Sequence, residues 1–245
     1  MVASSKTTPR VLGIDLGTTN TLAAFADGRV PRIVPTERGH SLLPSVVAFS
    51  GERVLIGHPA KEQLLINPND TIYGSKRLVG RPFHSRQVQA LRKRFAYDIV
   101  EGKDGFCAVR SGSKVHELTE ISAILLQQIA RYSTAHLSAS PGAGQLDAVV
   151  LSVPAYYPLS QREAVRKAGQ EAGLDVWRLV NEPTAAALAY GFNRNVEQRI
   201  LVFDLGGGTF DVSILEIGHG TFQVLATGGD GFLGGVDFDI RLTNH

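Results

Sequence analysis

The chain has 245 residues, of which 43% are hydrophobic and 20% are charged, and its formal net charge is +2 at pH 7. It is long enough for one large globular domain or two modest ones, and the small net charge does not indicate nucleic-acid binding. The single cysteine, Cys107, cannot form an internal disulfide, and no apolar run approaches the roughly 18–20 residues that span a bilayer. We therefore expect a cytoplasmic protein that binds neither nucleic acid nor membrane, with a flexible polar tail at residues 1–10.

The first part of the chain predicts strands and helices built around a buried sheet. Residues 11–16 form a short apolar run that is typical of a strand buried on both faces. Ser160 and Glu163 are spaced as a capping box that opens a helix running to Gly173. The expected elements are strands at 11–16, 21–26, 32–35, 45–49, 147–153 and 176–180, a short helical stretch ending near Gly80, helices at 119–137, 160–173 and 183–190, and a surface loop at 138–145.

After a polar joint at 193–199, the same pattern starts again. Strands are expected at 200–205, 210–217 and 222–227, followed by a helix that begins at Val236 or Asp237. The segment FDLGGGTFDVSIL of this second unit closely parallels IDLGTTNTLAAF of the first. The sequence thus predicts a duplicated α/β fold, with a complete first lobe at 11–198, a subdomain inserted in it at about 36–118, and an incomplete second lobe at 199–245.

Each copy of this hairpin has a carboxylate, Asp15 or Asp204, at the end of a strand beside a turn rich in glycine and threonine. Such turns offer backbone N–H groups and hydroxyls to an anion and allow its close approach. The carboxylate would repel a bare phosphate but suits hydrated Mg²⁺. A single copy would be read as a tight hairpin, whereas two copies favour a nucleotide held between two lobes. Strands follow both turns, which argues against a Walker loop or a dinucleotide fingerprint.

Five segments, in order along the chain, resemble the heat shock protein 70 family of DnaK-type molecular chaperones. They are IDLGTTN, NPNDTIYGSKRLVGR, SVPAYY, VNEPTAAALAYG and FDLGGGTFDVSIL. The resemblance covers residues 10–245 and implies the actin-like ATPase fold, a duplicated ribonuclease H-like fold. It also implies a stress-response chaperone that binds and hydrolyses Mg-ATP between two lobes, and so drives peptide binding and release during protein folding.

The resemblance assigns roles to individual positions in these motifs. The phosphate-binding positions are Gly17, Thr18, Thr19 and Asn20 in the first hairpin, and Gly207, Gly208 and Thr209 in the second. Asp15 and Asp204 would hold Mg²⁺ through water, and Lys76 would reach the γ-phosphate and the attacking water. Glu182, with Asp211 and Thr209, would complete the hydrolytic group, for which no covalent nucleophile is required. Without the resemblance, Lys76 reads as a solvated surface charge and Glu182 as a helix-terminal charge.

Three further positions resemble the family's coupling residues. Pro154 and Arg162 match a relay from the nucleotide site to the peptide-binding domain, and Arg178 matches a docking position for J-domain co-chaperones. A plain strand-end proline and two surface arginines remain the alternative. The implied partners are a J-domain co-chaperone, a nucleotide exchange factor, and unfolded peptides bound by a domain outside these residues. The implied cofactors are ATP or ADP with Mg²⁺, and K⁺ is left open; no ligand-spaced cluster predicts a transition metal.

Departures from the family pattern affect these expectations. Pro158 and Leu159 replace a polar pair, which puts normal signalling between the lobes in doubt, and Gly231 and Val236 stand where threonine and an acid are common. An incomplete second lobe would keep most phosphate-side residues, bind the nucleoside weakly and expose apolar surface on its last three strands. Two other functions stay open: a non-enzymatic remnant that binds co-chaperones, and another actin-fold phosphotransferase such as a sugar kinase, for which no sugar-side base is identified.

Overall fold

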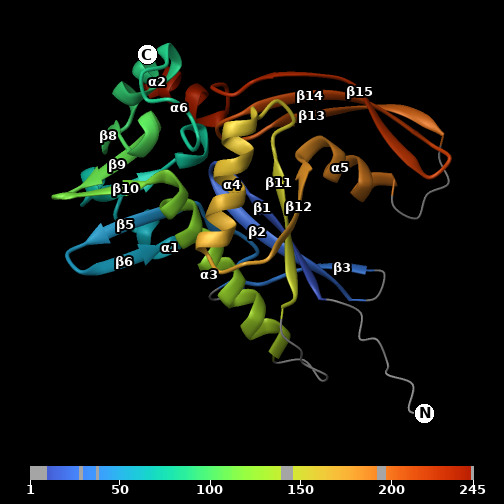
Figure 1. The fold of residues 1–245 in the computed structure, drawn as a ribbon, viewed down its shortest axis with the longest axis horizontal. Coiled ribbons are helices and arrows are strands. Elements are labelled where there is room, and N and C mark those ends of the chain that lie inside the picture. Colours follow the sequence, from blue (N-terminus) through green and yellow to red (C-terminus); the bar gives the residue numbers. More distant parts are fainter. Residues whose placement is uncertain (1–9, 28–29, 37–38, 139–145, 192–196, 244–245) are drawn as a thin grey trace.

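The computed structural model describes residues 10–27, 30–36, 39–138, 146–191 and 197–243, and shows a mixed α/β fold (Figure 1). Nearly all of the expected tail at 1–10 and of the loop at 138–145 lies outside these residues, as does most of the joint at 193–199. None of the helices described is both long and apolar enough to cross a membrane.

A six-stranded sheet forms the centre of the first unit. Its order is β12-β11-β1-β2-β3, with β4 paired to β2; β1, β11 and β12 are parallel, whereas β1, β2 and β3 are antiparallel neighbours. The strands are β1 (Val11–Leu16), β2 (Asn20–Asp27), β3 (Val30–Ile33), β4 (Leu43–Pro44), β11 (Ala148–Val153) and β12 (Val176–Asn181). Because parallel strands end at the same edge of a sheet, the ends of β1, β11 and β12 lie together.

β1 is buried mainly on one face, so the expectation of burial on both faces is wrong. Leu12, Ile14 and Leu16 are at most 4% exposed, whereas Gly13 between them is exposed. Alternate side chains of a strand point to opposite faces, and Gly13 contributes no side chain to the second face. That second face carries Asp15, which is partly accessible.

Two long helices pack against each other beside this sheet (Figure 1). α3 (Leu118–Ser138) buries Ile121, Leu125 and Ile129 at helical spacing, as the sequence predicts. α4 (Leu159–Glu171) begins one residue before Ser160, with Pro158 at its N-cap and no side-chain cap. The predicted capping box is therefore wrong, because Ser160 already lies inside the helix and cannot be its N-cap.

Two small antiparallel sheets, β6-β5-β7 and β10-β9-β8, lie between β4 and α3 in the sequence. Their strands are β5 (Val46–Ser50), β6 (Arg53–Ile56), β7 (Thr71–Tyr73), β8 (Asp98–Glu101), β9 (Cys107–Ser111) and β10 (Lys114–Glu117). The helical segments here are α1 (His58–Glu62), α2 (Arg86–Leu91), η2 (Pro68–Asp70), η3 (Ser75–Arg77), η4 (Arg92–Arg94) and η5 (Lys103–Gly105). The short helical stretch expected to end near Gly80 is present as the 3-10 turn η3, which follows the left-handed Gly74, whereas the strand β7 just before it was not predicted.

The second unit is a three-stranded antiparallel sheet of order β13-β14-β15. It consists of β13 (Gln198–Leu205), β14 (Phe210–Gly218) and β15 (Thr221–Asp230), and is followed by α6 (Gly235–Thr243). α5 (Glu182–Gly191) contacts strands of the six-stranded sheet, which we call the first sheet, and of this three-stranded sheet, which we call the second sheet. Its last residue is Gly191, where a Cβ would lie 2.9 Å from the Phe222 ring, so the missing side chain permits this close approach.

The second sheet is covered on one face only. Leu215 and Ile217 of β14 are at most 4% exposed beneath α5. On the opposite face Leu201 and Phe203 are each 63% exposed, and Ile214, which pairs with Leu201, is 41% exposed. The apolar surface expected on the last three strands is therefore present.

We expect a protein made of residues 1–245 to self-associate, because the exposed face offers adjacent large apolar side chains to a second copy. Replacing Leu201 and Phe203 together by serine should shift the protein towards monomer in sedimentation velocity over a series of concentrations. Leu65→Ser is the matched control, since Leu65 is 93% exposed and lies outside this sheet. A wild-type protein that stays monomeric at every concentration would contradict the prediction.

Candidate functional site

The first glycine turn, at residues 17–19, connects β1 to β2 and is held by Ser45. The Ser45 hydroxyl donates a hydrogen bond to the Gly17 carbonyl at 2.8 Å, and the Ser45 backbone N–H donates to the Thr19 carbonyl at 2.8 Å. A Cβ on Gly17 would lie 2.2 Å from the Asn20 carbonyl oxygen, so the turn requires glycine at this position. The backbone of the turn is thus constrained by the protein itself.

Asp15, Pro154 and Glu182 lie at one edge of the first sheet. Asp15 is near the end of β1, Pro154 follows β11, and Glu182 follows β12 and begins α5. Asp15 pairs in register with Ser152, whose hydroxyl donates to Asp15 Oδ1 at 2.9 Å. The carboxyl edge of parallel strands is where α/β sheets commonly bind ligands.

Lys76, in η3, forms a buried ion pair with Glu182. The Lys76 Nζ and Glu182 Oε1 atoms are 2.7 Å apart, and the two side chains are 7% and 12% exposed. The Tyr157 hydroxyl donates to the Lys76 carbonyl at 2.8 Å, which ties η3 to the segment after β11. Lys76 is therefore not the solvated surface charge that its sequence surroundings suggest.

The second glycine turn, at 206–209, connects β13 to β14 and brings two more carboxylates to this site. Asp204 and Asp211 are directly opposite in the β13–β14 register, so their side chains share one face of the sheet. Leu215 is four residues after Asp211 in β14, so the two side chains lie on the same face of the strand. This is the face that α5 covers. Because Glu182 begins α5, Asp204 and Asp211 are directed towards the Lys76–Glu182 pair.

The two glycine turns touch each other. A Cβ on Gly207 would lie 1.9 Å from Thr19 Oγ1, and a Cβ on Gly208 would lie 2.3 Å from Thr18 Cγ2. Glycine at both positions is what permits this approach. The hairpins therefore face each other as expected, but without a gap at these four residues, so a ligand has to lie alongside their contact rather than through it.

Four carboxylates act electrostatically on Lys76 or on one another in the described part of the chain: Asp15, Asp204, Asp211 and Glu182. Burial lowers the pKa of Lys76, but Glu182 and Asp15 outweigh this effect and raise it overall, so the ammonium group stays charged. Burial raises the pKa of Glu182, and Asp15 and Asp204 add to the increase against the opposing effect of Lys76. Burial and the charge of Asp15 likewise raise the pKa of Asp204.

Asp211 is the most perturbed carboxylate of this group. Burial, followed by the charges of Glu182 and Asp204, raises its pKa to about 7. Its side chain is 1% exposed, and neither carboxylate oxygen has a hydrogen-bond partner among the described residues. The hydroxyl of Tyr156, whose pKa is raised by burial and by Asp211, is also buried and unpartnered there. Buried polar atoms of this kind indicate that a ligand, ion or water completes the site.

The carboxylates fit a hydrated cation better than a directly ligated one. Within the described ranges, no three His, Cys, Asp or Glu side chains are grouped so that they could hold a metal ion by themselves. Mg²⁺ binds oxygen ligands and usually keeps several waters, so a few carboxylates beside a phosphate suffice. Asp15 and Asp204 are suited to this role because each is the second-last residue of a strand that leads into a glycine turn.

Two of the three predicted coupling residues are in contact. Arg162 Nη2 donates to the Pro154 carbonyl at 3.4 Å, to the Ala155 carbonyl at 3.0 Å and to Asn181 Oδ1 at 2.8 Å. Asn181 directly precedes Glu182, so this arginine connects the ends of β11 and β12 beside the Lys76 partner. Arg178 lies exposed on β12, and no hydrogen bond or ion pair described joins it to Arg162.

Sequence reasoning missed Arg77 and Asp237. Arg77 is 4% exposed and binds Asp237 through both terminal guanidinium nitrogens. Nothing local in SKRLVGR distinguishes Arg77 from the neighbouring basic residues, and its partner is 160 residues away in the sequence. Only the folded chain brings these two side chains together.

Comparison of the chain with known protein families gives one match. The family described as Hsp70 protein matches residues 11–245. The match includes both glycine turns, the Lys76–Glu182 pair and all four carboxylates. Membership implies the actin-like fold, with which the mixed α/β sheets agree. The resemblance found in the five sequence segments is thereby confirmed: this chain belongs to the Hsp70 family.

Proposed function

We propose that this chain is the ATP-binding part of an Hsp70-type chaperone and binds and hydrolyses Mg-ATP at the two glycine turns. The observation that carries the proposal is the buried Lys76–Glu182 pair, which lies among three further carboxylates at the edge where the turns meet. A single ammonium group does not neutralise four carboxylates. The residual negative charge favours a divalent cation, and the glycine turns favour phosphate.

The residues divide into those that bind phosphate and those that hold the cation. The backbone of 17–20 and 207–209 would cradle the phosphates, with the hydroxyls of Thr18, Thr19 and Thr209 as further donors. Asp15 and Asp204 would hold water molecules of the Mg²⁺ shell. When bound, Mg²⁺ would supply neutralisation of phosphate charge.

Lys76, Glu182, Asp211 and Thr209 are proposed to act on the attacking water and the γ-phosphate. The Lys76 ammonium group would stabilise negative charge on the transferred phosphoryl group. A raised pKa makes Glu182 and Asp211 better proton acceptors than ordinary carboxylates, so either can orient the water or accept its proton. Thr209, which is 9% exposed at the end of the second turn, would fix the position of the water or phosphate.

The coupling residues and partners follow from the family. Arg162 and Pro154 lie next to Asn181 and Glu182, so a change at the nucleotide can reach the outside of the first sheet through this contact. Arg178, exposed on β12, is proposed to contact a J-domain co-chaperone. A nucleotide exchange factor and unfolded peptides are the other proposed partners, the peptides being bound by a separate domain.

Lys76→Met should abolish most hydrolysis, because the γ-phosphate loses its buried cation. We expect single-turnover hydrolysis of Mg-ATP to fall at least ~100-fold, as on removal of one preorganised electrostatic group from an active site. The double variant Lys76→Met/Glu182→Gln avoids leaving Glu182 as an unpaired buried charge, so it measures the loss of the whole pair without that source of instability. Circular dichroism melting checks the fold of each variant.

Lys93→Met is the matched control, since Lys93 is exposed in η4. Calorimetric titration with Mg-ATP accompanies the kinetics for every variant. Wild-type protein that neither binds nor hydrolyses Mg-ATP would contradict the proposal and favour a non-enzymatic role, and phosphorylation of added sugars would favour a sugar kinase. Equal hydrolysis by the wild type and Lys76→Met would exclude the proposed role of the lysine.

Asp211 should make the stability of the ligand-free chain fall with rising pH. Its pKa rises from 3.8 to about 7 in the fold, so the folded state binds this proton more tightly than the unfolded state between about pH 4 and pH 7. Asp211→Asn removes that titration. The free energy of unfolding of the variant relative to wild type should therefore increase with pH by at most about 1.4 kcal/mol per unit across this window, and level off above it.

Urea unfolding at several pH values measures this difference. Asp98→Asn, at an exposed position of β8, is the control for a general change of charge. A difference between Asp211→Asn and wild type that does not vary with pH would show that Asp211 titrates normally.

A further inference from the structure

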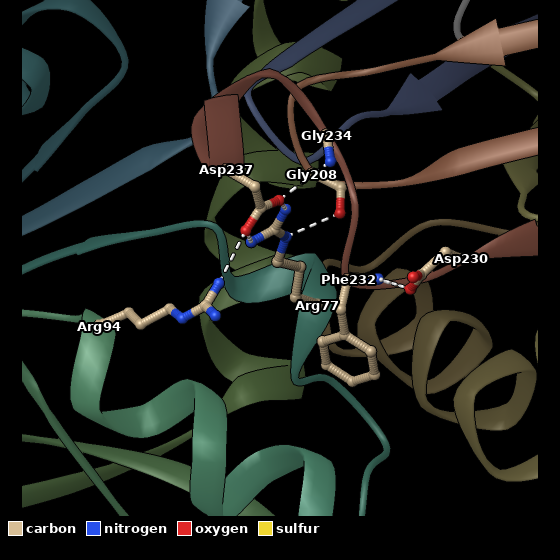
Figure 2. Close-up of polar contacts among 7 residues, drawn as sticks. All are labelled: Arg77, Arg94, Gly208, Asp230, Phe232, Gly234 and Asp237. Atoms are coloured by element: carbon tan, nitrogen blue, oxygen red, sulfur yellow. Dashed lines mark hydrogen bonds and ion pairs between the residues drawn. The ribbon is translucent and has the colours of Figure 1, made fainter. Parts of the chain in front are cut away.

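The 3-10 turn η3, which carries Lys76, also binds the second glycine turn and α6 through the next residue, Arg77. Arg77 Nε donates to the Gly208 carbonyl at 2.7 Å, and its two terminal nitrogens bind the carboxylate of Asp237 in α6 (Figure 2). Arg77 is 4% exposed and Asp237 13% exposed. One guanidinium group, all but buried, therefore joins η3, the second glycine turn and α6.

Asp237 is itself held from two other directions. Its Oδ2 atom accepts a hydrogen bond from the Gly234 backbone N–H at 2.9 Å, and its Oδ1 atom accepts one from Arg94 Nη1 at 3.0 Å (Figure 2). The Gly234 contact ties the carboxylate to the residue just before α6. Arg94 is 51% exposed, so its pair with Asp237 is the more solvated of the two.

Three successive backbone carbonyls of the second glycine turn each accept a hydrogen bond. The Gly206 carbonyl accepts from the Gly235 N–H at 3.0 Å, and the Gly207 carbonyl accepts from the Val236 N–H at 3.0 Å. The Gly208 carbonyl accepts from Arg77. In a trans peptide the C=O and the following N–H point in opposite directions. Holding the Gly208 carbonyl on Arg77 therefore aims the Thr209 N–H away from Arg77.

Two contacts of Arg81 further stabilise this arrangement. Arg81 Nε donates to the Arg77 carbonyl at 2.8 Å, and the Arg81 guanidinium lies 4.4 Å from the centre of the Phe232 ring in the loop before α6. Gly208 packs so closely on Arg77 that a Cβ there would lie 2.8 Å from its Nε atom. The turn, η3 and the start of α6 thus form one packed unit.

We propose that Arg77 is a positioning residue that sets the orientation of the phosphate-binding turn at 206–209 by holding the Gly208 carbonyl and Asp237 together. This rests on the proposed function for its consequence, the binding of phosphate, but not for the contact itself. Arginine suits the task because its planar group donates to a carbonyl and to a carboxylate at the same time, whereas a lysine ammonium cannot span both in this geometry. Asp237 links the turn to α6 through the same group.

Hydrogen–deuterium exchange on the ligand-free chain of 245 residues tests the contact without reference to ATP. Arg77→Met, Arg77→Lys and Asp237→Asn should each speed amide exchange in peptides covering 204–212 and 233–243 by about tenfold or more, because the carbonyl and carboxylate anchors are lost. Exchange in β11 should stay unchanged, which separates local loosening from global unfolding. Arg86→Met, at an exposed position of α2, is the matched control.

Calorimetric titration then measures how each variant changes the affinity for Mg-ATP. Arg77→Lys should weaken binding by about tenfold or more, as for loss of a group that orients direct ligand contacts. Unchanged exchange at 204–212 in Arg77→Lys and Asp237→Asn would overturn the proposal. Faster exchange with unchanged Mg-ATP affinity would overturn the positioning role. A wild-type chain that binds no Mg-ATP would instead count against the proposed function. The exchange result would still show whether Arg77 and Asp237 hold the turn at 206–209. If Arg77→Met does not fold, Arg77→Lys and Asp237→Asn carry the test.

Discussion

The ion pair between Lys76 and Glu182 joins segments 106 residues apart and places a buried positive charge at the carboxyl edge of the first sheet. Loss of Lys76 would leave Glu182 buried and uncompensated, at a cost of about 3–5 kcal/mol. Asp15, Asp204 and Asp211 surround the pair, so the site holds more negative charge than it neutralises. That surplus is the physical basis of the proposed Mg-ATP site.

The second constraint is the contact between the two glycine turns. Thr18 and Thr19 occupy the space that side chains at Gly208 and Gly207 would need. The carbonyls of each turn also accept hydrogen bonds from outside the turn, in the first from Ser45 and in the second from Arg77 and the start of α6. Their backbones are therefore oriented by the protein before a ligand arrives, which lowers the entropy cost of binding.

Much of the fold could be predicted because it depends on local patterns. The strand at 11–16, the long helix beginning near residue 118 and the restart of the pattern after residue 199 follow from hydrophobic periodicity. The errors arose where neighbours decided the outcome. Ser160 and Glu163 have the spacing of a capping box, yet the N-cap of α4 is Pro158, two residues before Ser160. The strand β7 was missed because its pairing with β5 joins segments that the local sequence does not connect.

The candidate site divides in the same way. The sequence alone determined the residue types that chemistry requires, including both Asp-Leu-Gly turns, Lys76 and Glu182, because these occur in short motifs with recognisable spacing. The tertiary structure alone decided that Lys76 is buried against Glu182, that Asp211 has no partner, and that Arg77 binds Asp237. Burial and pairing depend on which distant segments the sheets bring together, and a linear sequence records residue types without those distances.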